Sequence, residues 1–342
     1  MSQPKQPLIT VIMLNWNGKQ YLDDCLHSIQ AQSYPALQIT VVDNGSSDGS
    51  PEYVKNHFPA VNIIRNNKNL GFGGGTNIGI TGCTTDFLVI LNNDASLHPD
   101  CIKELYEAIS KDSMAGSCAS RIMLKSENDR IDAAGIVVCP DGLAIGRGRM
   151  EPTADYLDKK EVFFASGCCA LFRKTMLDDI GLFDEGFFAY AEDTDLGWRA
   201  QSRGWKTLYI PTAIVYHHHS GSTSGVSPIK AYLVERNRLC VAIKNFPLSL
   251  LVYGLWYTVR RYFWQAYGVL FSRGRAGDFI RQYTMFHLGI ILLKAWLCAF
   301  YMAPLMMKKR RRIRAEALIG PDRYWDILKR FGISARAIAL KS

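Results

Sequence analysis

Carboxylate and amide side chains close three apolar runs of this chain, at residues 39–50, 87–95 and 187–199. The first run ends at Asp43, the second at Asn92-Asn93-Asp94, and the third leads into Glu192-Asp193. An open α/β sheet gathers such residues at the carboxyl ends of its strands, where a ligand sits in the crevice and oxygen atoms hold a divalent cation. The three segments therefore predict an enzyme that handles a diphosphate.

Each segment also has a simpler explanation. The Asn-Gly and Ser-Ser-Asp-Gly sequences after Asp43 form turns without any ligand, and a strand-end turn also explains Asn92 to Asp94. Acids at 192–195 suit the first turn of any helix, because they complement the helix dipole. The aromatic residues of the preceding loop, Phe188 and Tyr190 among them, favour a sugar or lipid-linked acceptor instead.

A glycine-rich segment, residues 69–77, leads into a predicted helix near 75–82. Without side chains, its backbone amides can approach a nucleotide closely. The dinucleotide fingerprint is incomplete, because the third glycine is missing and the segment does not follow the first strand. A plain surface loop is the alternative.

Three histidines, His217 to His219, follow the strand-like residues 214–216. Imidazole can complete the ligand shell of Mn²⁺. Strand alternation places His217 and His219 on one face, so only part of the triplet can face the site. A structural or solvent-facing role remains the alternative for each of them.

Strand-like and helix-like segments alternate as far as residue 100. The predicted strands are 8–14, 39–42, 61–64 and 87–91, and the predicted helices are 21–32, 51–57 and 75–82. This alternation predicts crossover units and a mainly parallel sheet flanked by helices. Residues 115–213 are expected to add mixed strands and loops to the same sheet. A Ser/Gly-rich stretch at 220–225 then separates a catalytic domain, 1–225, from a helical region, 226–342.

The C-terminal region is helical and aromatic, with long apolar segments at 248–271 and 284–307. Lys294 interrupts the second, and Arg260-Arg261 sit at the centre of the first, so interfacial helices are expected rather than spanning ones. The basic run 308–314 predicts contact with an anionic membrane surface. A soluble helical bundle packed around its own apolar core is the alternative.

Composition supports a globular, intracellular protein. Of the 342 residues 48% are hydrophobic and 21% are charged, and the formal net charge is +9. The nine cysteines contain no C-x-x-C pair, which indicates reduced thiols rather than a disulfide framework or a zinc site. The N-terminus lacks a secretory pattern, so we expect the cytoplasmic face of the inner membrane, as a peripheral or monotopic protein, and no nucleic-acid partner.

In their order and spacing these segments resemble the family 2 glycosyltransferases, particularly the bacterial branch that includes rhamnosyltransferases of cell-surface polysaccharides. The resemblance covers roughly residues 8–240 and rests on residues 11–18, 41–50, 69–80, 91–95, 166–173, 183–199, 216–217 and 235–237. It implies a GT-A fold, to which the residues of the C-terminal region add a helical, membrane-associated part. It also implies inverting transfer of a sugar from a nucleoside diphosphate, with Mg²⁺ or Mn²⁺ as cofactor.

The resemblance also implies roles for individual residues. Asp193 would be the catalytic base, and Asp94 with His217 would hold the metal on the diphosphate. Residues on the donor side would be Asn15, Asp43, Asn69, Gly73, Asn92 and Asn93. Residues on the acceptor side would be Gly167, Phe188, Tyr190 and Glu192. Asp94 stands alone where many relatives carry a fuller D-x-D.

The branch resembled favours rhamnose from dTDP-rhamnose as the donor and a polyprenyl-linked, growing cell-surface glycan as the acceptor. Gln201-Ser202-Arg203-Gly204-Trp205 only superficially matches the Q-x-x-R-W signature of processive synthases, so we expect addition of one or a few residues. Two other functions stay open, a dinucleotide-binding oxidoreductase and a catalytically silent membrane-bound scaffold with the same fold. The oligomeric state is undetermined.

Overall fold

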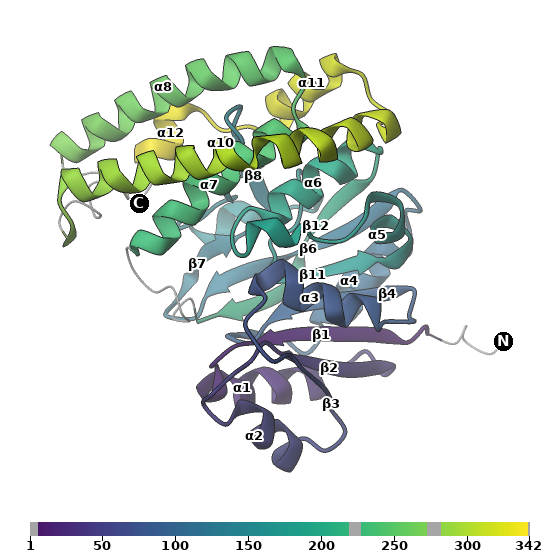
Figure 1. Cartoon of the computed structure of the whole chain (residues 1–342). Helices are drawn as coiled ribbons and strands as arrows, with labels where there is room; N and C mark the ends of the chain where they lie inside the picture. The colour runs from purple at the N-terminus through teal and green to yellow at the C-terminus, as the bar shows by residue number, and fades with distance from the viewer. Residues whose placement is uncertain (1–5, 219–226, 272–281, 341–342) are drawn as a thin grey trace. The chain divides into compact units, whose positions relative to one another are not determined.

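A computed structural model describes residues 6–218, 227–271 and 282–340 (Figure 1). The chain divides into two compact units. The first contains residues 1–136, 146–196 and 205–221, and the second contains 137–145, 197–204 and 222–342. The predicted Ser/Gly-rich boundary and the predicted domain limit at 225 lie outside the described residues, as does His219.

Strands and helices alternate through the first part of the chain, as predicted. They are β1 (Ile9–Asn15), α1 (Lys19–Gln30), β2 (Leu37–Asp43), α2 (Ser50–His57), β3 (Asn62–Arg65), α3 (Gly71–Thr81), β4 (Phe87–Asn92), β5 (Ala95–Leu97) and α4 (Cys101–Ile109). The later elements are β6 (Ala115–Leu124), β7 (Glu127–Ala133), β8 (Ile136–Val138), β9 (Ala144–Gly146), η1 (Thr153–Tyr156), β10 (Lys160–Val162), β11 (Cys169–Arg173), α5 (Lys174–Ile180), η2 (Glu185–Phe187), α6 (Glu192–Ser202) and β12 (Lys206–His217).

One large sheet carries the first unit. Its main order is β10-β12-β6-β11-β4-β1-β2-β3, with β5 paired to β12 and β7 paired to β6. The four strands β4, β1, β2 and β3 run parallel, whereas β11 runs antiparallel to both β4 and β6. The predicted parallel layer and the predicted mixed extension are both confirmed. Because β4, β1 and β2 are adjacent and parallel, their carboxyl ends lie together at one edge of the sheet.

Helices cover both faces of the sheet because the strands are apolar on both sides. Apolar residues of α1 and α4 share one buried core with alternate residues of β1 and β4, such as Val11 and Val89. On the other face α3 packs closely on β1 and β2, since Gly75 lies against Leu14 and Gly79 against Ile12. The helix begins at Gly71, four residues before the predicted start, so the glycines lie within its turns rather than in a loop before it.

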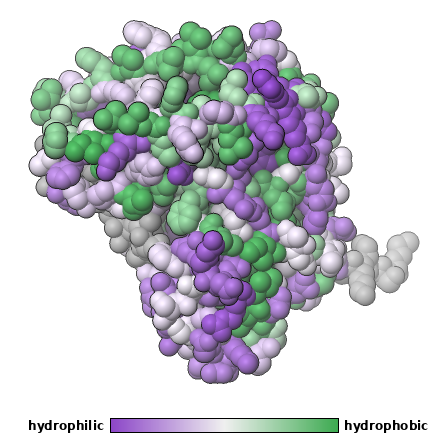
Figure 2. Space-filling model, viewed as in Figure 1, coloured by the Kyte–Doolittle hydropathy of each residue, from purple (hydrophilic) through white to green (hydrophobic). Residues whose placement is uncertain are grey.

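The second unit is helical, as predicted for the end of the chain. Its main helices are α7 (Pro228–Asn245), α8 (Leu248–Leu270), α10 (Met285–Glu316), α11 (Pro321–Phe331) and α12 (Ala335–Leu340). Within the described residues, α10 alone is long and apolar enough to cross a membrane by length and composition. Figure 2 shows apolar side chains gathered over α8 and α10.

Four buried charges pair inside this unit. Arg238 donates from Nε to Glu235 at 2.7 Å, and Arg261 donates from Nε to Asp141 at 2.8 Å and from Nη2 to Glu235 at 3.3 Å. Burial alone would raise the pKa of Glu235, but the charges of Arg238 and Arg261 lower it to about 2. The two arginines predicted at the centre of α8 thus differ, because Arg261 is buried and paired while Arg260 is exposed.

Gly79→Ala tests the close packing of α3 on the sheet. A Cβ at this position would lie 2.5 Å from Ile12 Cγ2 and 3.1 Å from Val42 Cγ2. We expect overpacking to lower the free energy of unfolding by about 1–3 kcal/mol, even though alanine favours a helix. Gly82→Ala is the matched control, because the nearest atoms there are 3.7 Å away. Equal denaturation midpoints for the two variants would contradict the close-packing argument.

Candidate active site

Three predicted residues form a hydrogen-bonded row across the carboxyl ends of β4, β1 and β2. Asn93 donates to Asn15 Oδ1 at 2.8 Å, and Asn15 donates to Asp43 Oδ1 at 3.2 Å. Asp43 Oδ2 in turn accepts from the backbone N–H of Ser46 at 3.1 Å. The row follows from the parallel register of the strands. Asn15 lies opposite Asp43, and Asn92, the last residue of β4, lies opposite Leu14.

Asn69 and Gly73 belong to a neighbouring segment that Asn44 holds in place. The Asn44 amide donates to Asn69 Oδ1 and to the Gly71 carbonyl, both at 3.0 Å, and Asn69 Oδ1 also accepts from the Gly71 backbone at 2.8 Å. Gly73 lies against Phe183. These contacts give both residues a role in shaping the segment, beside the donor-side role predicted for them.

Strand pairing brings Asp94 and His217 together, although 122 residues separate them in the chain. The short strand β5 pairs antiparallel with the end of β12, with Ala95 opposite His217. Asp94 directly precedes β5, and its Oδ1 lies 3.1 Å from His217 Nε2. Both side chains are almost fully buried. Of the predicted histidines that the structure describes, His217 is therefore the one whose side chain meets the Asp94 carboxylate, whereas the His218 backbone N–H donates to the Asp94 carbonyl at 2.9 Å.

His218 points elsewhere. Its Nε2 lies 2.9 Å from Lys125 Nζ, and its ring lies 5.4 Å from the Tyr21 ring. The alternation of side chains along the end of β12 explains why neighbouring imidazoles face different partners.

Asp94 and His217 suit a divalent cation. Two adjacent ligands of an octahedral ion, with bonds of about 2.1 Å, lie about 3 Å apart, which matches the 3.1 Å separation of Asp94 Oδ1 and His217 Nε2. Among the described residues, no three or more His, Cys, Asp or Glu side chains are grouped to hold an ion unaided. An ion on this pair would therefore also need phosphate or water oxygens, as Mg²⁺ usually does.

Asp193 reaches the same edge of the sheet through residues 166–169. Its Oδ2 accepts from the Gly167 backbone at 3.4 Å, and the Cys168 carbonyl accepts from the Asn92 backbone at 2.8 Å. The Cys168 thiol contacts the His217 imidazole; burial raises the pKa of this thiol to about 11, although His217 opposes the shift. The predicted base and the predicted metal ligands thus converge on one turn of chain.

The loop before Asp193 has unusual backbone geometry. Phe188, Tyr190 and Ala191 all have positive φ, between 65° and 69°, a region that costs residues with side chains energy. The Phe188 carbonyl accepts from the Phe72 backbone at 2.6 Å, at the first turn of α3. Phe188 itself is 43% exposed, so its ring is available for contact with a ligand.

Glu192 and Asp193 form a pair of like charges. Burial, together with the charge of Asp193, raises the pKa of Glu192 to about 8. Burial also raises the pKa of Asp193, although hydrogen bonds from the Thr194 and Gly167 backbones oppose the shift. The two carboxyl groups therefore titrate as a coupled pair, and the pair keeps a proton to a higher pH than a lone carboxyl group does.

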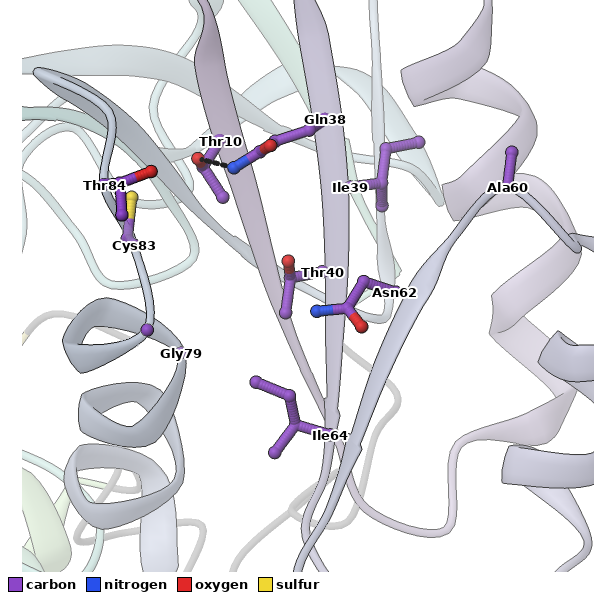
Figure 3. A pocket seen from close by; sticks show the side chains of 11 residues that line it. Thr10, Gln38, Ile39, Thr40, Ala60, Asn62, Ile64, Gly79, Cys83 and Thr84 are labelled. Atoms are coloured by element: carbon purple, nitrogen blue, oxygen red, sulfur yellow. Dashed lines mark hydrogen bonds between the residues drawn. The ribbon is translucent and has the colours of Figure 1, made fainter.

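Figure 3 shows a cavity of about 420 Å³ that residues of β1, β2, β3 and the end of α3 line. Thr10 and Gln38, which are hydrogen bonded at 2.6 Å, line it near the opposite ends of β1 and β2 from Asn15 and Asp43. None of the predicted site residues lines this cavity.

Sequence reasoning missed one buried carboxylate in the site. Asp132 Oδ2 lies 2.7 Å from His217 Nδ1, on the other side of the ring from Asp94. The surrounding sequence, Arg130-Ile131-Asp132-Ala133, showed no motif. An acid between two apolar residues, early in the predicted mixed region 115–213, was the only available signal.

The family model for glycosyl transferase family 2 matches residues 10–181, half of the chain. The chain belongs to this family. The matched region contains β2, β4, β11 and all of β1 except Ile9, whereas Asp193 and His217 lie beyond its end. Family 2 membership also favours the predicted transferase over the alternative of a dinucleotide-binding oxidoreductase.

Two curated relatives of this family 2 protein act on different glycans. An N-acetylglucosaminyl-diphospho-decaprenol L-rhamnosyltransferase of Mycobacterium tuberculosis is 26% identical over 243 residues, which are 63% of this chain and 78% of the relative. A poly-beta-1,6-N-acetyl-D-glucosamine synthase of Staphylococcus aureus is 23% identical over 219 residues, which are 61% of this chain and 49% of that synthase.

Solved structures show the GT-A fold that was predicted. GalNAc-T7, solved with UDP, GalNAc and Mn²⁺, matches with a TM-score of 0.57 and 18% identity over 71% of this chain and 48% of its own. A fragment of S. aureus TarS, residues 1–349, matches with a TM-score of 0.53 and 17% identity over 93% of this chain and 91% of its own. At these identities the match establishes the fold alone.

Glu192→Gln tests the buried acid pair through its effect on stability. Because the pKa of Glu192 is higher in the folded protein than in the unfolded chain, the folded protein binds the extra proton at intermediate pH. The stability of the parent protein should therefore fall relative to Glu192→Gln as the pH rises from about 5 to about 8. The change in the unfolding free energy of the parent relative to Glu192→Gln should approach about 1.4 kcal/mol for each unit by which the pKa is raised.

Denaturant unfolding at a series of pH values measures this difference. Glu107→Gln is the control, because Glu107 is exposed on α4 and has no like charge buried beside it. A constant difference in stability between Glu192→Gln and the parent from pH 5 to pH 9 would contradict a raised pKa at Glu192.

Proposed function

We propose that the chain is an inverting glycosyltransferase. It would move a sugar, rhamnose from dTDP-rhamnose, to a polyprenyl-linked, growing cell-surface glycan. The observation that carries this proposal is the convergence of Asp94, His217 and Asp193 at residues 166–169. The M. tuberculosis relative, whose name includes both rhamnose transfer and a decaprenol-linked acceptor, supports the choice of substrates.

In this mechanism Asp193 removes the proton of an acceptor hydroxyl. The freed oxygen attacks the anomeric carbon from the side opposite the diphosphate, so the glycosidic bond forms as the bond to the diphosphate breaks and the configuration inverts. The backbone N–H groups of Thr194 and Gly167 hold the Asp193 carboxylate and fix its direction. General-base help of this kind contributes about 10²- to 10⁴-fold to the rate.

The departing diphosphate would lie at the carboxyl ends of β1, β2 and β4. Asp94 and His217 would hold Mg²⁺ or Mn²⁺ there, and the cation would offset the negative charge that grows on the leaving group. GalNAc-T7, which has the same fold, was solved with Mn²⁺, which is consistent with a divalent ion. The row Asn93, Asn15 and Asp43 supplies polar groups for the nucleoside and sugar.

A lipid-linked acceptor requires the protein to reach a membrane, and the second unit has a suitable surface. Large apolar side chains along one face of α8 are exposed, and α10 exposes a second set. They are Leu248, Val252, Leu255, Trp256, Val259 and Phe263 on α8, and Phe286, Leu293, Leu297, Phe300 and Tyr301 on α10. An exposed apolar area of this kind beside basic residues is typical of helices that lie in the membrane interface.

Contacts of α10 with α7 favour an interfacial position over a spanning one. Trp296 donates to Glu235 at 3.0 Å, and Arg310 donates to the Ile243 carbonyl at 3.0 Å, so α10 follows α7 over several turns. If α10 crossed the bilayer in this arrangement, the charged side chains of α7 would enter the hydrocarbon at a large energetic cost. The protein would therefore bind as a monotopic protein at the cytoplasmic face of the inner membrane.

Asp193→Asn tests the assigned base. We expect the variant to keep its unfolding midpoint and to lose about 10²- to 10⁴-fold in transfer rate with donor and acceptor saturating. The assay follows radiolabelled sugar from dTDP-rhamnose and other nucleotide sugars into a polyprenyl-linked acceptor. Asp178→Asn is the control, because Asp178 is exposed on α5.

Two outcomes of this assay contradict the proposal. A near-parental rate for Asp193→Asn would remove Asp193 from the role of base. Absence of transfer by the parent protein from every nucleotide sugar, in the presence of Mn²⁺, would favour the catalytically silent scaffold instead.

Replacing exposed basic residues of α10 tests the membrane surface. We expect Lys308→Gln, Arg311→Gln and Arg314→Gln together to weaken binding to phosphatidylglycerol vesicles about 100-fold, since each cation near an anionic surface contributes about 1 kcal/mol. The matched control replaces exposed Lys55, Lys68 and Lys111 of the first unit by glutamine. Vesicle flotation measures the binding of both triple variants and of the parent protein.

Salt and alkaline washing of membranes distinguish the two positions of α10. Release of the parent protein by these washes agrees with an interfacial helix, because salt screens the attraction between surface charges. Complete resistance to both washes would contradict the monotopic arrangement.

A further inference from the structure

We propose that Asp132 is a positioning residue that orients His217, so that His217 Nε2 faces Asp94 and is ready for a divalent cation. This inference rests on the proposed metal-binding role of Asp94 and His217. No role for Asp132 follows from the sequence motifs, which include neither this residue nor the strand that carries it.

An irregularity in strand pairing sets the position of Asp132. Strand β7 pairs antiparallel with β6, with Ile131 opposite Met123 and Ala133 opposite Ile122. One step along β6 therefore corresponds to two steps along β7, and Asp132 is the extra residue of a β-bulge. Bulges redirect a side chain and occur often beside active sites, usually on edge strands such as this one.

The same ladder brings His217 within reach of the bulge. Strand β6 also pairs with β12, with Met123 opposite Tyr216 and Leu124 opposite His217. β6 thus lies between the strand that carries Asp132 and the strand that carries His217. The redirected carboxylate spans this gap, with Oδ2 at 2.7 Å from Nδ1 of the imidazole.

Hydrogen-bond chemistry then determines what the ring can do. A carboxylate only accepts hydrogen bonds, so Nδ1 must be the donor in this contact. Asp94 Oδ1, which lies 3.1 Å from Nε2, likewise only accepts, so the ring between the two carboxylates carries a proton on each nitrogen; a divalent cation would replace the proton at Nε2, while Asp132 keeps the one at Nδ1. Carboxylates that accept from the second nitrogen of a metal-binding histidine fix ring orientation in this way, and their loss typically costs about 10- to 100-fold in metal affinity.

Asp132 is itself held firmly. Its side chain is 8% exposed, and its Oδ1 forms an ion pair with Arg149. Asp132 Oδ1 therefore pairs with Arg149, and Asp132 Oδ2 pairs with His217. Because the imidazole ring lies between Asp132 and Asp94, Asp132 acts on the ion through His217 rather than as a ligand.

Mn²⁺ binding measured without turnover tests this proposal. Electron paramagnetic resonance of free Mn²⁺, with the protein saturated by dTDP, gives the affinity of the parent and of each variant. We expect Asp132→Ala to bind Mn²⁺ about 10- to 100-fold more weakly, approaching His217→Gln. Asp132→Asn should lose less Mn²⁺ affinity than Asp132→Ala, because the asparagine amide oxygen can still accept a hydrogen bond from His217 Nδ1. Asp129→Asn, an exposed acid of the same strand, should bind as the parent does.

Excess Mn²⁺ separates positioning from a general structural role. In transfer assays, a raised Mn²⁺ concentration should restore the rate of Asp132→Ala toward the parental value, whereas it should not restore Asp193→Asn. If Asp132→Ala does not fold, Asp132→Asn and its intermediate affinity decide the question by the same measurements.

The outcomes distinguish this inference from the proposed function. Parental Mn²⁺ affinity in Asp132→Ala, or in Asp132→Asn where the alanine variant does not fold, overturns the role of Asp132 and leaves the transferase proposal in place. Failure of the parent itself to bind Mn²⁺ with dTDP overturns the metal site on which both depend.

Discussion

The pairing of β12 with β5 and β6 is the interaction on which the candidate site depends. β5 sets Asp94 beside His217, and β6 holds the same end of β12 at the distance that Asp132 can span. Backbone hydrogen bonds of a ladder fix side-chain positions to a fraction of an ångström, which the cross-strand contacts of a metal site require. An imidazole between two carboxylates is thus placed by the sheet rather than by a loop.

The acids at the start of α6 depend on a different kind of support. Close packing of α3 on the sheet, made possible by Gly75 and Gly79, places its first turn where Phe72 binds the Phe188 carbonyl. This contact helps to hold a loop whose backbone has three residues with positive φ. Strain of this sort persists where surrounding structure fixes it, and here it lies directly before Glu192 and Asp193 at the start of α6.

The second unit combines charge and apolar surface on the same helices. Arg238, Arg261, Glu235 and Asp141 neutralise one another inside the unit, so the buried faces of α7 and α8 can be polar. The opposite face of α8 is then free to be apolar and exposed. Removal of one partner from such a set would leave an uncompensated buried charge, which is far more costly than losing a surface ion pair.

The sequence by itself determined the alternating elements, the parallel start of the sheet, the helical end of the chain and the acids Asp43, Asp94 and Asp193, because periodicity and strand-end chemistry are local properties. Tertiary structure alone decided that the glycines of α3 serve helix–sheet packing and that Asp132 enters the site. These two features depend on close approach of a helix to the sheet and on a bulge between strands. Such features arise only when distant segments pair, so the neighbouring residues of the sequence carry no sign of them.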